Sequence, residues 1–403
     1  MGDHPKTRVL HIITRLILGG AQENTLLTVI GQQRTGRYDV VLLAGIDDGP
    51  EGTLHDEAAR QGVSLVLTPW LVRPINPFKD VGALLILYRL IRQGRFDVVH
   101  THSSKAGILG RIAARLAGVP VVIHTLHSLV FHEYQSRLRN WLYILLKRLC
   151  APLTDCYISV CDATTRGALQ QGIGSADRYV TVYSGIDLTP FLEISETMTA
   201  EQAKIRLGLN PSKPVVGKVA RLMHQKGHDL FLRAASRIIC RQPDVQFLLV
   251  GDGILRQSLE RMADDLGVRA RVTFAGLVKP EDVPAYMRAM DVVVHTSIRE
   301  GVARVIPQAY AVGSPVVALN LDGAPEVIEN GLNGFLIDPG DEAAVADAVE
   351  ALLRSQDLRK EMVRRGREVV LKRFPVHVMV EAINRVYEML LVRKGGRTNR
   401  RLA

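Results

Sequence analysis

Residues 97–127, DVVHTHSSKAGILGRIAARLAGVPVVIHTLH, contain two short β-branched runs separated by a stretch with helical periodicity. The runs DVVHTH and VPVVIHT have the length and composition of buried strands. Strand, helix and strand in this order form a βαβ unit, because parallel strands need a long crossover connection. The segment therefore predicts a parallel sheet with helices on both faces.

The same alternation continues along the chain, with one interruption at residues 184–214. The predicted strands before it lie at residues 8–14, 38–45, 63–68, 96–103, 119–125 and 155–160, and those after it lie at 215–221, 245–251, 271–277, 291–297, 315–320 and 334–339. The interruption predicts two α/β domains. Ligands of open parallel sheets bind beyond the carboxyl ends of the strands, so the loops after strands are the expected sites of chemistry.

Bulk composition supports a globular chain with two domains. A length of 403 residues with 47% hydrophobic and 23% charged residues exceeds one ordinary core. No apolar run approaches the roughly 18 residues that span a bilayer, and the N-terminus lacks a signal-peptide core, which favours the cytoplasm. The four cysteines show neither metal-ligand spacing nor disulfide density, so reduced thiols that pack as small hydrophobes are expected.

The net charge of +10 is partly a property of the chain's end. Residues 392–403 carry five basic residues and no acid. Such a run is ordinarily a solvated end, with attraction to an anionic surface as the alternative. Basic residues do not alternate with aromatic ones as in a nucleic-acid groove, so no nucleic-acid partner is expected.

Two loops after predicted strands suit an anionic ligand. Gly19 and Gly20 form a tight turn before a helix, where the backbone can approach a ligand and free N–H groups attract an anion. Arg221 and Lys226 share one loop and could clamp a diphosphate. The ordinary alternatives are an unliganded turn and a pair of solvated cations. His127 ends a buried-type strand, where a structural histidine is the ordinary interpretation.

Together these motifs resemble glycosyltransferase family 4 (group 1), the retaining nucleotide-sugar glycosyltransferases of the GT-B fold. The resemblance covers nearly the whole chain. The stretches that carry it are GGAQENTLL (19–27), the quoted residues 97–127, SGIDLTPF (184–191), GKVARLMHQKGHDLFLRAA (217–235), LLVGDGILRQSLE (248–260), VTFAGLV (272–278) and EGVARVIPQAYAVGSPVVALNLDGAPEVIENGLNGFLIDPGD (300–341).

The resemblance implies two Rossmann-like, doubly wound parallel-sheet domains that face an interdomain cleft. Residues 1–190 would form the acceptor-side domain and residues 191–372 the donor-binding domain. Residues 373–403 would form a helix that crosses back to the first domain, followed by the basic tail. The implied reaction moves a hexose-type sugar from a nucleoside-diphosphate sugar to an acceptor, such as a lipid-linked or cell-surface polysaccharide precursor, with retention of the anomeric configuration.

The resemblance also implies roles for individual residues. Arg221 and Lys226 would neutralise the donor diphosphate, Glu300 would hold hydroxyls of the donor sugar, and His127 would lie near sugar and acceptor. With these cations and a helix N-terminus facing the diphosphate, no metal and no cofactor beyond the donor co-substrate are expected. The other donor-binding residues implied are Gly19, Gly20, Gly251, Asp252, Gly253, Leu277, Val278, Gly301, Ala303, Arg304, Val305 and Gln308.

Two positions depart from the family pattern. Ala303 stands where glycine is usual, and Gln308 stands where a second acid is usual. Glutamine keeps an acceptor oxygen for the nucleotide ribose and removes a negative charge, so we expect a change in donor affinity and no change in reaction type. The alternatives are a catalytically silent nucleotide-sugar binder and a sugar-nucleotide epimerase or hydrolase of the same fold.

The acceptor side is only weakly indicated. Ser103, Ser104 and Lys105 open a predicted helix and could bind an acceptor phosphate, although a helix cap is the more ordinary role. Residues 133–150, EYQSRLRNWLYILLKRLC, place an apolar stripe on one helical face between cations. The stripe fits either a core helix or a helix lying in an anionic membrane surface, which would make the protein peripheral at the inner face of the membrane. The residues of this stripe are Leu138, Trp141, Leu142, Leu145 and Leu149.

Overall fold

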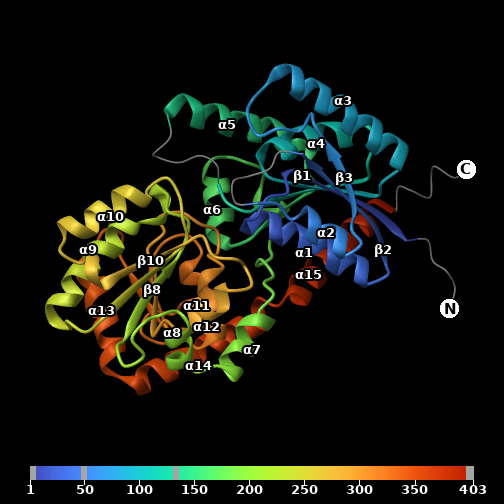
Figure 1. Ribbon diagram of the computed structural model, residues 1–403. Helices are drawn as coiled ribbons and strands as arrows, with labels where there is room; N and C mark the ends of the chain where they lie inside the picture. The colour runs from blue at the N-terminus through green and yellow to red at the C-terminus, as the bar shows by residue number, and fades with distance from the viewer. Residues whose placement is uncertain (1–5, 47–51, 130–135, 396–403) are drawn as a thin grey trace, which may run out of the picture. The chain divides into compact units, whose positions relative to one another are not determined.

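A computed structural model describes residues 6–46, 52–129 and 136–395, which fold as two α/β units (Figure 1). Unit 1 comprises Met1–Ile186 together with Val376–Ala403, and unit 2 comprises Asp187–Pro375. The boundary lies four residues before the predicted one at residue 190. Most of the basic tail, residues 396–403, and the first three residues of the 133–150 segment lie outside the described residues.

Unit 1 is built on a seven-stranded parallel sheet in the order β3-β2-β1-β4-β5-β6-β7. Its strands are β1 (Thr7–Arg15), β2 (Tyr38–Gly45), β3 (Ser64–Thr68), β4 (Val98–His102), β5 (Val121–Leu126), β6 (Cys156–Ser159) and β7 (Tyr179–Thr181). Its helices are α1 (Gly20–Arg34), α2 (His55–Arg60), α3 (Pro77–Gly94), α4 (Ser104–Leu116), α5 (Arg137–Cys150), α6 (Asp162–Gln170) and α15 (Val376–Gly395), with 3-10 turns at Ala151–Leu153 and Ala176–Arg178.

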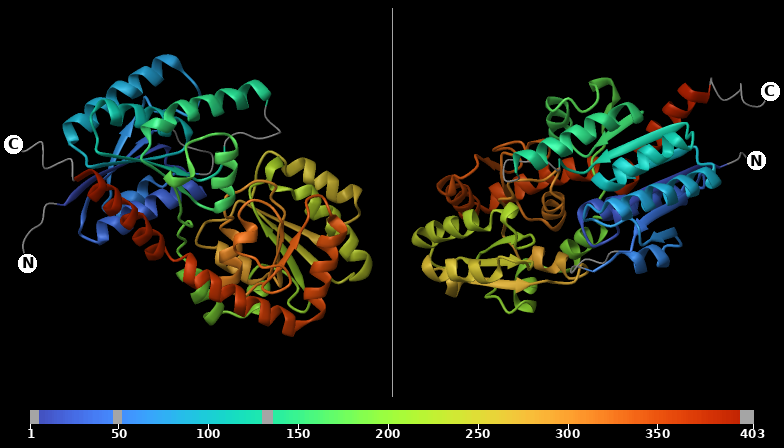
Figure 2. Two further views of the ribbon diagram at one scale, coloured as in Figure 1. Left: turned by 180° about the vertical axis from the view of Figure 1, so that it is seen from behind. Right: turned by 90° about the horizontal axis from the view of Figure 1, so that it is seen from above.

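Helices cover both faces of this sheet, as Figures 1 and 2 show. Successive residues of a strand point to opposite faces. Val9 and Ile13 of β1 therefore pack with α1 and α15, whereas Leu10 and Ile12 pack with α3 and α4. Because both faces are buried, β4 and β5 consist of buried residues only, which explains why they read as continuous strand-like runs.

Unit 2 repeats the plan with a six-stranded parallel sheet in the order β10-β9-β8-β11-β12-β13. Its strands are β8 (Val215–Val219), β9 (Gln246–Val250), β10 (Val272–Gly276), β11 (Val292–His295), β12 (Val316–Leu319) and β13 (Phe335–Ile337). Its helices are α7 (Thr189–Thr197), α8 (Ala200–Arg206), α9 (His228–Arg241), α10 (Arg256–Asp265), α11 (Val283–Arg288), α12 (Val305–Val312), α13 (Glu342–Arg354) and α14 (Gln356–Arg373), with 3-10 turns at His224–Lys226, Arg269–Arg271 and Ala324–Glu326.

Each sheet has one point at which the strand order reverses direction. In unit 1 this switch point lies between β1 and β4, and in unit 2 it lies between β8 and β11. Crevices at such points are the usual ligand sites of open α/β sheets. All twelve predicted strands are present, and among the described residues the pattern missed one strand, the three-residue β7. The predicted α/β fold with two doubly wound parallel sheets is confirmed.

Candidate active site

Two loops of unit 2 meet beside its switch point. One follows β8 and carries Arg221 and Lys226, and the other follows β11 and carries Glu300. Lys226 Nζ and Glu300 Oε1 form an ion pair in which both side chains remain partly exposed. The structure thus joins two predicted site residues that are 74 positions apart in the sequence.

Backbone contacts lock these two loops together. Gly227 has a φ of +59°, and a Cβ there would lie 2.0 Å from the carbonyl oxygen of Thr296. Thr296 Oγ1 donates to the Gly227 carbonyl at 2.6 Å, and the Ile298 amide donates to the Gln225 carbonyl at 3.0 Å. A side chain at Gly227 would force the loops apart and would displace Lys226 from Glu300.

A buried lysine that the sequence-based prediction missed lies beneath this pair. Lys218 of β8 is 1% exposed, and its Nζ donates to Thr296 Oγ1 at 2.8 Å. The pKa of Lys218 is lowered to about 7, mainly by burial and secondly by the positive charge of Lys226. The negative charge of Glu300 opposes this shift with a smaller effect. The available signal was a lone lysine inside an apolar strand, VVGKV, where a charged side chain needs a partner.

A small pocket of about 10 Å³, partly open to solvent, adjoins the β11–α12 loop. Three of its lining residues were predicted: Glu300, Gly301 and Ala303. Three polar lining residues were not predicted: His295, Ser297 and Asp322.

Asp322 fixes the position of Glu300. Its Oδ2 accepts a hydrogen bond from the Glu300 amide at 2.6 Å, and its backbone adopts a φ of +51°. Burial raises the pKa of Asp322, partly offset by this hydrogen bond. Burial, with the charges of Lys218 and Lys226, lowers the pKa of His295 well below its usual value, so this histidine is neutral at pH 7. The pocket is therefore lined by two carboxyl groups and a neutral imidazole, and Lys226 is attached to this lining through its ion pair with Glu300.

Helix α12 begins at Val305, two residues after the pocket residue Ala303. Its first backbone bonds run from the Ile306 amide to Ala303 and from the Gln308 amide to Arg304. The predicted residues Ala303, Arg304 and Val305 thus lie at the N-terminus of α12. Gln308 lies in the first turn and is half-buried.

The loop after β9 requires its two predicted glycines. Gly251 and Gly253 have φ values of +129° and +156°, and a Cβ at either would come within 2.6 Å of a backbone carbonyl oxygen of the β8 loop. Asp252 accepts a hydrogen bond from the Gly253 amide at 2.7 Å. Leu277 and Val278 follow the neighbouring strand β10, and Leu277 is largely exposed. The five residues therefore flank two adjacent strand ends of unit 2.

Arg221 stands at the start of the same β8 loop and is exposed. Its backbone carbonyl accepts a hydrogen bond from the buried His228 Nε2 at 2.9 Å. The Leu222 amide donates to the Asp252 carbonyl at 2.9 Å, which ties the β8 loop to the glycine loop. Arg221 is thus exposed on a loop whose backbone is held from two sides.

In unit 1 the predicted residues again follow strands. Gly19 precedes α1, and Gly20 is its first residue. His127 follows β5 and is half-buried, with its Nε2 3.2 Å from His102 Nδ1. Burial lowers the pKa of His127 to about 4, so it is neutral at pH 7.

The helix-cap interpretation of Ser103 is wrong. Ser103 occupies the N-cap position of α4, but its hydroxyl makes no capping bond. It pairs instead with Thr14 Oγ1 at 2.7 Å, in a backbone conformation with a φ of +61°. Lys105 forms an ion pair with Asp80 at 2.6 Å, so its charge is already balanced, and Ser104 is the first residue of α4.

Comparison with known proteins decides the family. Residues 19–185 match the family model for the glycosyl transferase 4-like domain, and residues 199–369 match the model for glycosyl transferases group 1. The UDP-Gal:alpha-D-GlcNAc-diphosphoundecaprenol alpha-1,3-galactosyltransferase of Escherichia coli is 30% identical over 97% of this chain and 99% of its own length. The chain belongs to the group 1 glycosyltransferases.

The glycosyltransferase has further relatives of known sequence or structure. Putative glycosyltransferase EpsD of Bacillus subtilis is 29% identical over 78% of this chain and 82% of its own length. The crystal structure of Anabaena HepE in complex with UDP-glucose superimposes with a TM-score of 0.77 at 24% identity, covering 95% of this chain and 99% of that one. This likeness shows the fold, which is GT-B.

The two departures from the family pattern occupy different places in this glycosyltransferase. Ala303 is 5% exposed and lines the pocket, so its methyl group narrows the space that a glycine would leave. Gln308 lies in the first turn of α12, outside the pocket lining. No helix in the described part of the glycosyltransferase is long and apolar enough to cross a membrane.

Proposed function

We propose that this glycosyltransferase moves a hexose from a nucleoside-diphosphate sugar to an acceptor and retains the anomeric configuration. The observation that carries the proposal is the Lys226–Glu300 pair at the switch point of unit 2, beside a pocket lined by Glu300, Gly301 and Ala303. A cation next to a carboxylate suits a ligand with an anionic part and a hydroxyl-rich part. The names of the relatives agree, since one is a UDP-Gal transferase and another was crystallised with UDP-glucose.

In this proposal the cations stabilise the leaving group. When the bond between the sugar and the diphosphate breaks, negative charge develops on the diphosphate oxygens. Arg221 and Lys226, with the N-terminal amides of α12, would offset that charge in a partly desolvated site. Glu300 would accept hydrogen bonds from sugar hydroxyls and keep Lys226 oriented. Because these groups already supply positive charge, we propose that transfer needs no divalent metal.

We further propose that unit 1 meets an anionic membrane surface through its helix layer α3, α4 and α5, which lie side by side on one face of the sheet (Figures 1 and 2). Within the residues of these three helices Asp80 is the only acid. The basic residues of the layer are Lys79, Arg89, Arg92, Lys105, Arg111, Arg115, Arg137, Arg139, Lys147 and Arg148.

Large apolar side chains are exposed on the same layer. On α5, Leu138 is 75% and Trp141 59% exposed, which does not fit a core role for these residues. On α3, Phe78 is 88% exposed, followed by Val81 and Leu85 at helical spacing.

Four of the layer's basic residues do not contribute free surface charge, because Lys105 and Arg115 are paired with Asp80 and Asp155, and Arg111 and Lys147 are buried. The other six are exposed. Exposed apolar residues among exposed cations are typical of helices that lie in an anionic interface. Such a surface fits a lipid-linked acceptor, the kind named for the Escherichia coli relative.

The test is a donor screen that measures release of the nucleoside diphosphate. Purified protein is incubated with UDP-glucose, UDP-galactose and their GDP and ADP counterparts, with and without a polyprenyl-diphosphate-linked sugar in vesicles. We expect release with one donor that rises when the lipid-linked acceptor is present. Binding of a donor without turnover on any acceptor would instead identify a silent binder, and a product with the donor sugar epimerised would identify an epimerase.

A further inference from the structure

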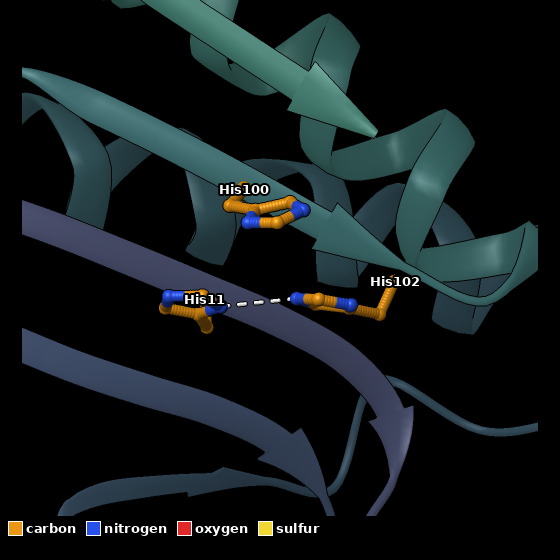
Figure 3. A group of neighbouring side chains, drawn as sticks. All are labelled: His11, His100 and His102. Carbon is orange, nitrogen blue, oxygen red and sulfur yellow. Dashed lines mark hydrogen bonds between the residues drawn. The ribbon is translucent and has the colours of Figure 1, made fainter. Parts of the chain in front are cut away.

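Three buried histidines lie together inside unit 1. His11 comes from β1, and His100 and His102 come from the neighbouring strand β4 (Figure 3). Each is at most 1% exposed. They lie on the face of the sheet covered by α1 and α15, because His11 contacts Gln32 of α1 and His100 contacts Tyr387 of α15.

A continuous row of hydrogen bonds runs from this cluster to His127. His11 Nε2 lies 2.9 Å from Gln32 Oε1, and its Nδ1 lies 3.0 Å from His102 Nε2 (Figure 3). His102 Nδ1 lies in turn 3.2 Å from His127 Nε2. The row connects a glutamine in the core with the half-buried histidine that follows β5.

The glutamine sets the direction of the row. Gln32 Nε2 donates to Asn384 Oδ1 at 3.0 Å, which leaves Gln32 Oε1 to accept from His11 Nε2. A neutral imidazole carries one proton, so His11 Nδ1 must accept from His102 Nε2. By the same rule His102 Nδ1 accepts from His127 Nε2. The rings are neutral at pH 7, since burial lowers the pKa of His11 and His127 to about 4 and that of His102 well below its usual value.

We propose that Gln32, His11 and His102 are positioning residues that hold His127 in the tautomer protonated at Nε2. Nδ1 of His127 is then a hydrogen-bond acceptor for a sugar hydroxyl. The inference rests on the proposed function and on the expectation from the family resemblance that His127 lies near the donor sugar. It adds a role for three core residues that touch no substrate.

The alternative use of this cluster is a metal site. Ligand nitrogens of His11, His100 and His102 lie within 4.8 Å of one another, which is close enough for one ion. Hydrogen bonds already engage them: His11 Nδ1 pairs with His102 Nε2, and the two nitrogens of His100 lie 2.6 Å from Tyr387 Oη and from Thr125 Oγ1. These contacts favour the hydrogen-bonded row over a bound ion.

The direct test reads the tautomer by NMR. Full-length protein labelled with ¹⁵N-histidine is observed at pH 7.5 without substrate, and the two-bond N–H couplings of each ring identify its protonated nitrogen. Loss of one signal in His127→Ala assigns the ring. We expect the proton of His127 on Nε2. A proton on Nδ1, rapid exchange between the two tautomers, or a stoichiometric metal ion in the purified protein would overturn the proposal.

A matched pair of variants tests the positioning role. His102→Gln can still reach His11 but cannot bridge to His127. The control His124→Gln removes a buried histidine of β5 whose hydrogen bonds within the described residues go to Thr101. We expect His102→Gln to give mixed tautomers at His127. Its kcat should fall by at most about fivefold, and its donor KM should stay within about twofold of the wild-type value. His124→Gln should keep both kcat and the tautomer. Equal effects of the two variants would mean a structural role only. If His102→Gln does not fold, the NMR measurement of the His127 tautomer in the wild type still tests the proposal. That measurement needs no turnover, so its result is independent of the donor screen.

Discussion

Lys226 and Glu300 are paired across the switch point of unit 2, with one residue on the loop after β8 and the other on the loop after β11. The pairing means that neither charge is free to act independently. A bound diphosphate would attract Lys226, while the Glu300 backbone remains held by Asp322. Lys226, predicted to bind the diphosphate, and Glu300, predicted to bind the sugar, thus act as one coupled pair.

This coupling predicts similar losses from either side of the pair. Lys226→Ala or Arg221→Ala should lower kcat/KM by about a hundredfold or more, as loss of a charge-stabilising donor typically does, and Glu300→Ala should cost at least as much. The double variant Lys226→Ala/Glu300→Ala should lose less than the sum of the single effects. Steady-state kinetics measures all of these. Lys213→Ala, which breaks the surface pair with Asp244, is the control and should retain activity. Full additivity would show that the two residues act separately.

Gln308 should affect the donor more than the reaction. With the diphosphate ~7 Å away and an effective dielectric near ~20, the missing negative charge relieves roughly 2 kcal/mol of repulsion. Gln308→Glu should therefore stay active, with kcat within about tenfold and a raised donor KM, whereas Gln308→Ala should raise donor KM by loss of a ribose partner. Kinetics against varied donor distinguishes them. A wild type that is inert with every donor, beside an active Gln308→Glu, would mean a disabled site.

Transfer should survive a chelator. Arg221, Lys226 and the α12 amides would already offset the diphosphate charge, so an excess of EDTA should leave kcat within about twofold. Inductively coupled plasma analysis of the treated enzyme checks that no metal remains. Activity that disappears with EDTA and returns only with magnesium or manganese would show that the charge assignment is wrong.

Acid should destabilise unit 1. His11 has a pKa of about 4 in the folded protein and about 6.5 when unfolded, so its contribution is complete above pH 6.5 and is lost as the pH falls towards 4. At pH 5 the loss for His11 alone is about 2 kcal/mol, and His100 and His102 shift in the same direction. Urea unfolding at pH 7.5 and 5.0 measures the change. His11→Gln should show a smaller difference between the two pH values, and an equal one would exclude His11 as a cause.

The helix layer of unit 1 should bind anionic vesicles. Leu138→Ser/Trp141→Ser should weaken flotation with phosphatidylglycerol vesicles at low salt, and Phe78→Ser should add to the effect. Ile205→Ser, which removes an exposed apolar residue of unit 2, is the matched control and should float as the wild type does. Equal flotation with neutral and anionic vesicles would exclude the electrostatic part of the proposal.

The sequence predicted strands and strand-end loops well because their signals are local. Buried parallel strands read as apolar runs, and Gly251 and Gly253 lie where only glycine fits the backbone. The sequence predicted side-chain contacts less well, because a contact between residues far apart in the chain produces no periodic pattern in the sequence. The bond between Ser103 and Thr14, the support of Glu300 by Asp322 and the burial of Lys218 beneath Thr296 all depend on which strands lie side by side.

The return of α15 to unit 1 has a consequence for biosynthesis. Met379, Ile383, Val386 and Tyr387 belong to the core that also contains β1 and α1, and Tyr387 is the partner of His100. A chain emerging from the ribosome therefore exposes part of that core until residues 376–390 have been made, whereas unit 2 is complete earlier. Although its strands are translated first, unit 1 is the last to finish folding.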